Sequence, residues 1–117
     1  MENEINKEEV LTEDELEQVA GGTRGELSCD TKFLNALGVM DITHEPGYCQ
    51  NHMTDVRKEI NSYLQDNSNL TGFKVSAVSV NGENTYRIHG KKVPRSKFYH
   101  DICQALGKSN FDYKQYL

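Results

Sequence analysis

Cysteine and histidine side chains are the groups in this sequence best suited to chemistry, because thiolates attack electrophiles and imidazoles transfer protons and bind metals. The chain has three cysteines, Cys29, Cys49 and Cys103. His44 and His52 flank Cys49, and Cys29 would complete a set of four zinc ligands. Only Cys49 and His52 have the short separation typical of zinc fingers, and Cys29 has no second cysteine two residues away. We therefore assign no metal ligands.

A thiol nucleophile paired with an imidazole base is the second chemistry that these residue types allow. Cys49 or Cys103 together with His100 would supply the two groups. No motif that would stabilise an oxyanion accompanies either pair. We therefore predict no catalytic residue, no enzymatic activity and no cofactor.

The C-terminal half of the chain concentrates basic and aromatic residues. Such a mixture is typical of surfaces that bind nucleic acid or an anionic membrane, and also of a solvated rim whose aromatic rings lie in the core. The basic residues are Lys91, Lys92, Arg95 and Lys97, and the aromatic ones beside them are Tyr86, Phe98 and Tyr99. We find no strong signal for nucleic acid. The aromatic tail Phe111, Tyr113 and Tyr116 either packs on the body or engages a target.

The elements that must position these residues follow from hydrophobic periodicity and from the glycines and prolines. The first 22 residues form one amphipathic helix, with Leu11, Leu16 and Val19 on one apolar arc and Gly21-Gly22 at its end. Thr23 to Ser28 has no pattern and is expected to be an irregular connection.

The body after this connection is expected to bury one modest core of helices against a small antiparallel sheet. Arg57 is expected on the outward face of a helix, together with Lys58 and Glu59. The two glycine turns, Asn81-Gly82 and His89-Gly90, favour hairpins. The expected elements are a helix over 30–37 stopped by Gly38, an irregular stretch over 39–53, a helix capped by Thr54 or Asp55, strands over 71–80, 85–88 and 91–93, and a helix from Pro94 that Gly107 stops.

Charge divides the chain at the same place as the paired glycines. The first 22 residues contain eight acidic residues and one lysine, a net charge of −7. The remaining 95 residues contain ten acidic and twelve basic residues, a net charge of +2. Such asymmetry indicates an acidic appendage on a mildly basic domain. At 117 residues the chain is too short for two full-sized domains, and it has no apolar run long enough to span a membrane.

The string from Leu11 to Gly22 contains the most specific motif. Its marked positions are Leu11, Glu15, Leu16, Val19, Gly21 and Gly22. This pattern resembles the double-glycine leader peptides of bacteriocins and related secreted bacterial peptides. The resemblance covers the first fifth of the chain. It implies that the peptidase domain of an ABC transporter recognises the leader, cleaves between Gly22 and Thr23, and exports the rest.

The residue types suit that role. A helix with spaced apolar side chains docks in a hydrophobic groove, and two glycines let an extended chain enter a narrow catalytic cleft. In the exported form, Cys29 and Cys49 are the candidate disulfide, which would close a loop of about 20 residues and contribute about 3 kcal/mol. Cys103, on the last helix, is expected to be a buried thiol.

The sequence therefore predicts a precursor with a leader over residues 1–22 and a mature α+β domain over residues 23–117. This domain would comprise two helices, a two- or three-stranded antiparallel β-meander and a C-terminal helix. We expect a cytoplasmic precursor and a secreted, bacteriocin-like product whose target is a protein or an anionic cell surface. The mature region lacks a Tyr-Gly-Asn-Gly-Val motif and a long apolar helix, unlike typical pore-forming bacteriocins. Two alternatives stay open: an enzymatically modified peptide precursor, and a cytoplasmic binding domain with an integral N-terminal helix.

Overall fold

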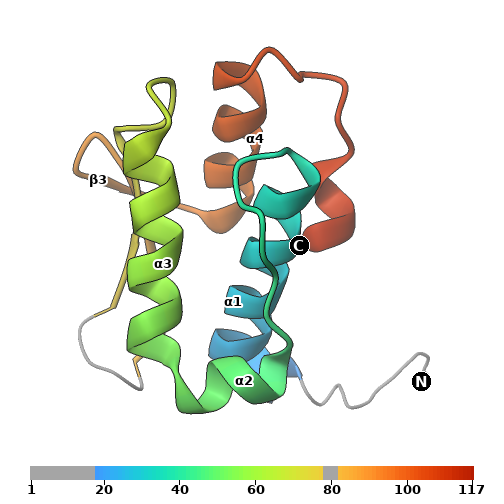
Figure 1. Ribbon diagram of the computed structural model, residues 1–117, viewed down its shortest axis with the longest axis vertical. Coiled ribbons are helices and arrows are strands. Elements are labelled where there is room, and N and C mark those ends of the chain that lie inside the picture. Colours follow the sequence, from blue (N-terminus) through green and yellow to red (C-terminus); the bar gives the residue numbers. More distant parts are fainter. Residues whose placement is uncertain (1–17, 78–81) are drawn as a thin grey trace.

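The structure is a computed structural model that describes residues 18–77 and 82–117, with side chains from Thr23 onward. Within these residues, four α-helices, a short 3-10 helix and a three-stranded antiparallel sheet form the mixed α+β fold expected from the sequence (Figure 1). In chain order the elements are α1 (Gln18–Ala36), α2 (Pro46–Asn51), α3 (Met53–Asp66), β1 (Phe73–Ser76), β2 (Thr85–Ile88), β3 (Lys91–Val93), α4 (Arg95–Ala105) and η1 (Tyr113–Tyr116).

Helix α1 corrects two expectations. It continues through Gly21-Gly22, where we expected a helix to end, and it includes Thr23 to Ser28, which we expected to be irregular. Glycine in a helix costs about 0.5–1 kcal/mol relative to alanine, which is a small penalty beside tertiary packing. Leu27 and Ser28 are buried, so this segment is helical because it packs against the rest of the domain.

The glycines that end the long helices α1 and α4 were predicted correctly. Gly38 and Gly107 have φ values of +81° and +70°, the left-handed conformation that glycine adopts without a steric penalty. After α1, the amide of Val39 donates to the carbonyl of Leu34 at 2.8 Å, which closes a Schellman motif. The matching bond after α4 runs from Lys108 N to Cys103 O, also 2.8 Å.

The segment between α1 and the sheet is more helical than expected. Within the stretch that we expected to be irregular, Pro46 starts the short helix α2, in the first-turn position where its missing N–H costs nothing. Helix α3 follows at Met53, and its N-cap, His52, lies two or three residues before the expected cap. Its apolar side chains at helical spacing, Val56, Ile60 and Leu64, are fully buried, and Tyr63 on the same stripe is half-buried.

The sheet has the order β1-β2-β3, with both neighbouring pairs antiparallel. The β2–β3 hairpin turns at His89-Gly90 as predicted, and both residues have positive φ, as the tightest hairpin turns require. Strand β1 is shorter than the expected strand over 71–80. Residues 78–81, which contain part of the expected Asn81-Gly82 turn, lie outside the described residues.

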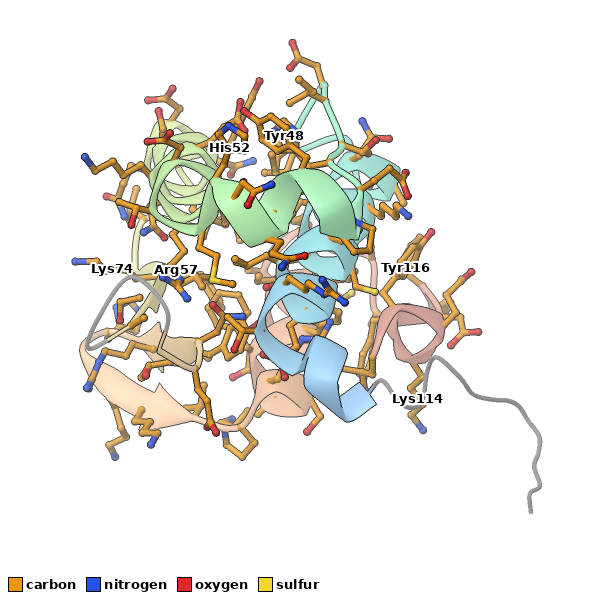
Figure 2. The ribbon with its side chains drawn as sticks, turned by 90° about the horizontal axis from the view of Figure 1, so that it is seen from below. Tyr48, His52, Arg57, Lys74, Lys114 and Tyr116 are labelled. Carbon is orange, nitrogen blue, oxygen red and sulfur yellow. The ribbon has the colours of Figure 1, made fainter. Side chains whose placement is uncertain are left out.

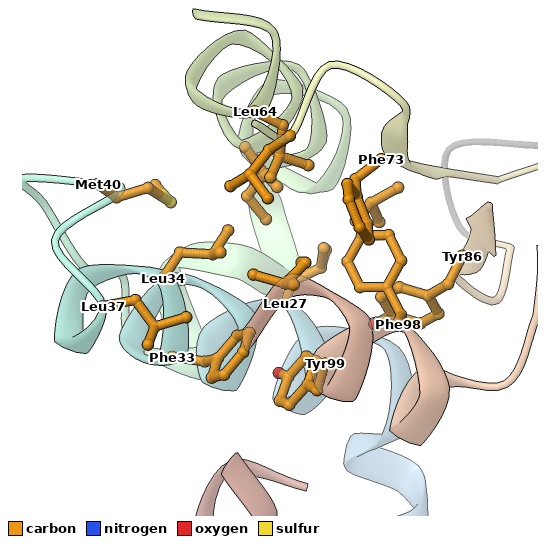
Figure 3. Packing of buried hydrophobic residues seen from close by; sticks show 14 of the residues in the cluster. Leu27, Phe33, Leu34, Leu37, Met40, Leu64, Phe73, Tyr86, Phe98 and Tyr99 are labelled. Atoms are coloured by element: carbon orange, nitrogen blue, oxygen red, sulfur yellow. The ribbon is translucent and has the colours of Figure 1, made fainter. Parts of the chain in front are cut away.

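The core lies between the inner face of the sheet and the helices (Figure 3). In Figure 1, α1 runs between α3 and η1, while α3 and α4 pack on the sheet. Phe33 of α1 and Tyr99 of α4 stack with their ring centroids 3.8 Å apart. The aromatic tail packs back on this core, since Phe111 and Tyr116 both lie against Phe33. The tail therefore packs on the body, which is the first of the two expectations.

Candidate functional site

The proposed cleavage site lies in the first part of helix α1. Gly21, Gly22 and Thr23 all belong to the helix, and Val19 is helical too. Leu11, Glu15 and Leu16 lie outside the described residues. The site is therefore built, as far as the structure describes it, from the start of α1 and the side chains that contact it from Thr23 onward.

An asparagine ties the start of α1 to the sheet. The Nδ2 of Asn84, the residue just before β2, donates to the carbonyl oxygen of Thr23 at 3.1 Å and to Glu26 Oε1 at 3.1 Å. The Oδ1 of the same side chain accepts from Arg57 Nε at 2.9 Å. The residue directly after the proposed cut is thereby joined to elements about 60 residues further along the chain.

Arg57 corrects a further expectation, since it is 6% exposed rather than directed outward. Its Nη2 donates to the carbonyl oxygen of Gly82 at 2.8 Å. Burial lowers the pKa of Arg57 and raises the pKa of Glu26, while the hydrogen bond from Asn84 opposes the rise at Glu26. A long arginine stem buries easily along apolar surface, so helix periodicity alone does not predict its position.

The side chains that the structure describes on α1 all follow the proposed cut. Among the side chains that the structure describes on α1, the first fully buried one is Leu27, four residues beyond the cleavage position. Thr23 to Glu26 are half-buried. Arg24 also reaches α2, where it donates a hydrogen bond to Gln50. A chain beginning at Thr23 would keep every one of these contacts.

A helical scissile segment must open before a peptidase can cut it, because proteases bind their substrates as extended strands. The start of α1 is suited to opening. Gly21, Gly22 and Gly25 each weaken the helix relative to alanine.

Gly25 offers a direct test of this opening step. A Cβ built at Gly25 meets no atom within 4 Å, so Gly25→Ala fits sterically. We expect it to stabilise the domain by about 0.5–1 kcal/mol and raise Tm by a few degrees. Cleavage after Gly22 should become slower at the same time, because the stiffer helix opens less often. Thermal melts and a cleavage time course check the two effects, and faster cleavage would contradict the opening step.

The cysteines carry free thiols in this structure. Cys49 and Cys103 are buried, as expected for Cys103, and Cys29 is half-buried. Burial raises the pKa of Cys49 to about 11, with a further small contribution from a negative charge on Cys29. The two thiols lie on α1 and α2, and these helices pack against each other.

A link between Cys29 and Cys49 stays a prediction for the exported protein. We expect peptide mapping after alkylation, without reductant, to recover these two cysteines in one linked pair and Cys103 as the alkylated thiol. Because the pKa values of all three thiols are raised by burial, oxidation of the folded chain should be slow at neutral pH. A link that involves Cys103 would contradict the assignment.

The candidate zinc ligands do not form a metal site in the described structure. His44 Nε2 lies 2.6 Å from Glu59 Oε1, and His52 Nδ1 lies 2.8 Å from the carbonyl oxygen of Tyr48. The Tyr48 ring is stacked between the two imidazoles, with centroid distances of 4.3 and 4.0 Å (Figure 2). No group of three or more histidine, cysteine, aspartate or glutamate residues within the described ranges is arranged to hold a metal ion.

The candidate nucleophile–base pairs place each partner in other contacts. His100 is exposed on α4, and its Nδ1 lies 2.9 Å from Asp101 Oδ1. Cys103 is buried on the same helix. The raised pKa values of Cys49 and Cys103 keep both thiols protonated at neutral pH, which is the less nucleophilic form.

The basic and aromatic cluster is divided between surface and core. Tyr86, Phe98 and Tyr99 are buried, whereas Lys91, Lys92 and Lys97 are exposed. Lys97 pairs with Asp101 at 2.9 Å. The rings are therefore unavailable for stacking on nucleobases. This division is the one expected if the lysines form a solvated rim and the rings belong to the core.

Sequence reasoning missed a buried polar cluster around Asp30. This carboxylate is 2% exposed and accepts hydrogen bonds from Tyr86 Oη at 2.7 Å, from Tyr99 Oη, and from Arg95 Nε at 3.2 Å. Arg95 also donates to the carbonyl oxygens of Tyr116 and Leu117. No motif joins these residues, because they come from α1, β2, α4 and the C-terminal segment.

The charges in this cluster depend on one another. Burial raises the pKa of Asp30, and the guanidinium of Arg95 and the hydroxyls of Tyr99 and Tyr86 oppose that rise. Burial by itself would lower the pKa of Arg95, but the negative charge of Asp30 raises it above its usual value. Each side chain of the cluster forms hydrogen bonds within the domain, so the cluster holds α1, β2, α4 and the C-terminal segment together.

Comparisons with protein-family models, with curated proteins and with solved structures found no match. In the part of the chain that the structure describes, no helix is both long enough and apolar enough to cross a membrane.

Proposed function

We propose that this chain is the precursor of a small secreted bacteriocin-like bacterial protein. In this proposal, the peptidase domain of an ABC transporter recognises Leu11, Glu15, Leu16 and Val19, cleaves after Gly22, and the transporter exports residues 23–117. The observation that carries the proposal is the six-position leader motif, which ends where the charge of the chain changes sign.

The part of α1 whose side chains are described, from Thr23 onward, belongs to the mature region, and its first fully buried side chain is Leu27. The contacts of Thr23 with Asn84 and of Arg24 with Gln50 also lie in that region. A peptidase that opens α1 around the Gly22–Thr23 bond would leave the buried contacts from Leu27 onward in place, and the hydrogen bonds of Thr23 and Arg24 can form again in the cleaved chain.

Burial speaks against the alternative of an enzymatically modified peptide. Ser28, Thr31, Cys49 and Cys103 are buried in the folded domain, and the hydroxyls of Ser28 and Thr31 already donate to backbone carbonyls. A modifying enzyme acts on a chain that it can reach. These four side chains would be accessible only before folding.

The continuous helix favours the other alternative as a second candidate function. Because α1 runs without interruption from Gln18 to Ala36, residues 18–22 can be an integral part of a binding domain. Thermal melts distinguish the two candidates. If residues 23–117 alone melt at the temperature of the full chain, the first 22 residues are dispensable for folding, as a leader must be, whereas collapse of the fold identifies an integral helix.

Incubation with a cognate peptidase domain tests the cleavage itself. We expect intact-mass analysis to show a product that begins at Thr23. The double variant Gly21→Ala/Gly22→Ala should resist cleavage while remaining folded, because alanine fits a helix but obstructs a narrow cleft. Cleavage at another bond, or no cleavage while an established leader is cut under the same conditions, would refute the proposal.

A further inference from the structure

The outer face of the sheet carries a row of three cations, which we call the basic row: Lys74, Arg87 and Lys92. Strand register places Lys74 opposite Arg87, and Arg87 opposite Lys92. Residues directly opposite one another share a face of a sheet, with side chains close together. The preceding row, Val75–Tyr86–Val93, turns toward the core, so the basic row faces outward.

The basic row has no acidic counterpart within the described residues. None of its three side chains forms an ion pair with another described residue, and Arg87 Nη1 donates only to the carbonyl oxygen of Gly90, at 3.1 Å. The neighbouring pair on the same face, Ser76 and Thr85, is uncharged. Like charges directly opposite one another destabilise a sheet, so an anionic partner would stabilise this face.

The chemistry of the face argues against single-stranded nucleic acid as that partner. Proteins that bind single strands on a sheet present aromatic rings on which bases stack. Here Phe73 and Tyr86 are buried on the opposite face. The outer face offers charge without stacking, which suits a carboxylate-rich peptide.

The chain itself contains such a peptide, the acidic segment (residues 1–17), with eight acidic residues and one lysine. The described part of α1, which follows this segment in the chain, lies near the strands of the basic row. The hydrogen bond from Asn84 to the carbonyl oxygen of Thr23 places the start of α1 beside the start of β2. Arg87 lies three residues along the strand from Asn84, a distance of about 10 Å.

Tethering favours the encounter. Seventeen residues can span up to about 56 Å, which exceeds the longest dimension of the molecule, 43 Å. Linked groups also meet at effective concentrations in the millimolar range, so individually weak ion pairs suffice. We propose that the outer sheet face is a docking surface for the acidic segment of the same chain, with Lys74, Arg87 and Lys92 pairing with its carboxylates.

Zero-length carbodiimide coupling of lysine amines to carboxylates tests the contact in the intact, full-length chain. At low salt, we expect links from the acidic segment to Lys74 and Lys92 at about five times the yield at Lys58 and Lys114. At 1 M salt, where charges are screened within about 3 Å, the excess should disappear. Peptide mapping by mass spectrometry gives the yields.

Lys58 and Lys114 are matched controls because both are exposed and neither lies on the sheet. Lys58 follows Arg57, which bonds Asn84, so it too lies near the start of α1. In Figure 2, Lys74 and Lys114 lie on either side of α1. Equal yields at all four lysines would show that tethering alone brings the segment near, and would overturn the proposal.

Two further measurements exclude other occupants. A mixture of ¹⁵N-labelled and unlabelled chains should give links within one chain, and links between chains would replace the proposal with docking of a second copy. The variant Glu2→Gln/Glu4→Gln/Glu8→Gln/Glu9→Gln leaves the leader motif intact and should shift amide resonances of β1, β2 and β3 near the basic row. Absence of these shifts would overturn the proposed docking. It would leave the proposed cleavage untouched, because the leader motif is unchanged in this variant, so the two proposals can be refuted independently.

Discussion

Replacing Asp30 with alanine is expected to lower the free energy of unfolding by about 3–5 kcal/mol, the usual cost of breaking a buried ion pair from one side. The substitution would leave Arg95 buried without its carboxylate, and the hydroxyls of Tyr86 and Tyr99 without their acceptor. In a domain of this size, such a loss lowers Tm by about 12 °C or more. Thermal or urea melts measure it.

Two variants make this result specific. Asp112→Ala removes an exposed carboxylate and should change stability by less than about 0.5 kcal/mol. Asp30→Leu/Arg95→Met removes both charges together and should recover part of the loss, because no buried charge then lacks a partner. If Asp30→Ala melts within a few degrees of the unchanged protein, the cluster does not join the elements as described.

The physical reason for so large an effect is that Asp30 receives hydrogen bonds from separate parts of the chain. Tyr86 comes from β2, and Arg95 and Tyr99 come from α4. Arg95 in turn bonds the carbonyl oxygens of Tyr116 and Leu117. One carboxylate on α1 therefore connects the sheet, α4 and the aromatic tail.

Truncating the proposed leader anchors should affect processing without affecting stability. For Leu16→Ala/Val19→Ala we expect kcat/KM for cleavage after Gly22 to fall by about 10- to 100-fold, because each lost apolar contact in a groove costs about 1 kcal/mol or more. The anchors bind the peptidase domain in our proposal, so Tm should stay within about 2 °C of the unchanged chain. Cleavage kinetics and melts on the same preparations provide both measurements.

The matched control is a substitution of similar size outside the motif. Ile5→Ala removes an aliphatic side chain from the same acidic segment and should leave kcat/KM unchanged within about twofold. If Leu16→Ala/Val19→Ala lowers Tm by several degrees, the side chains pack on their own domain, and the integral-helix alternative replaces the leader. If kcat/KM does not fall, recognition does not use these positions.

Local signals in the sequence predicted the elements that depend on neighbouring residues. The stops at Gly38 and Gly107 and the turn at His89-Gly90 require a particular backbone conformation, which glycine supplies wherever it occurs. The stripe of α3 follows from its 3.6-residue period. The α+β class follows from the order of such segments and was confirmed.

The wrong predictions share a physical cause, which is that packing outweighed a local preference. Gly21-Gly22 favours a helix end, yet α1 continues because its later turns are buried against α2 and α3. Arg57 was expected in solvent, but it accompanies the buried stripe and bonds Asn84. Burial of a long side chain depends on what lies opposite, which the sequence of one helix does not contain.

By itself, the sequence determined the α+β class, the order of the strands and of the helix that follows them, the helix stops, the leader motif and the separation of acidic segment from basic body. These features depend on residues within a few positions of one another, or on composition alone. The tertiary structure decided that Thr23 is held by Asn84, that Asp30 joins Tyr86, Tyr99 and Arg95, and that three cations align across the sheet. Such contacts depend on strand register and helix packing, which bring together residues separated by up to 69 positions and leave no trace in local spacing.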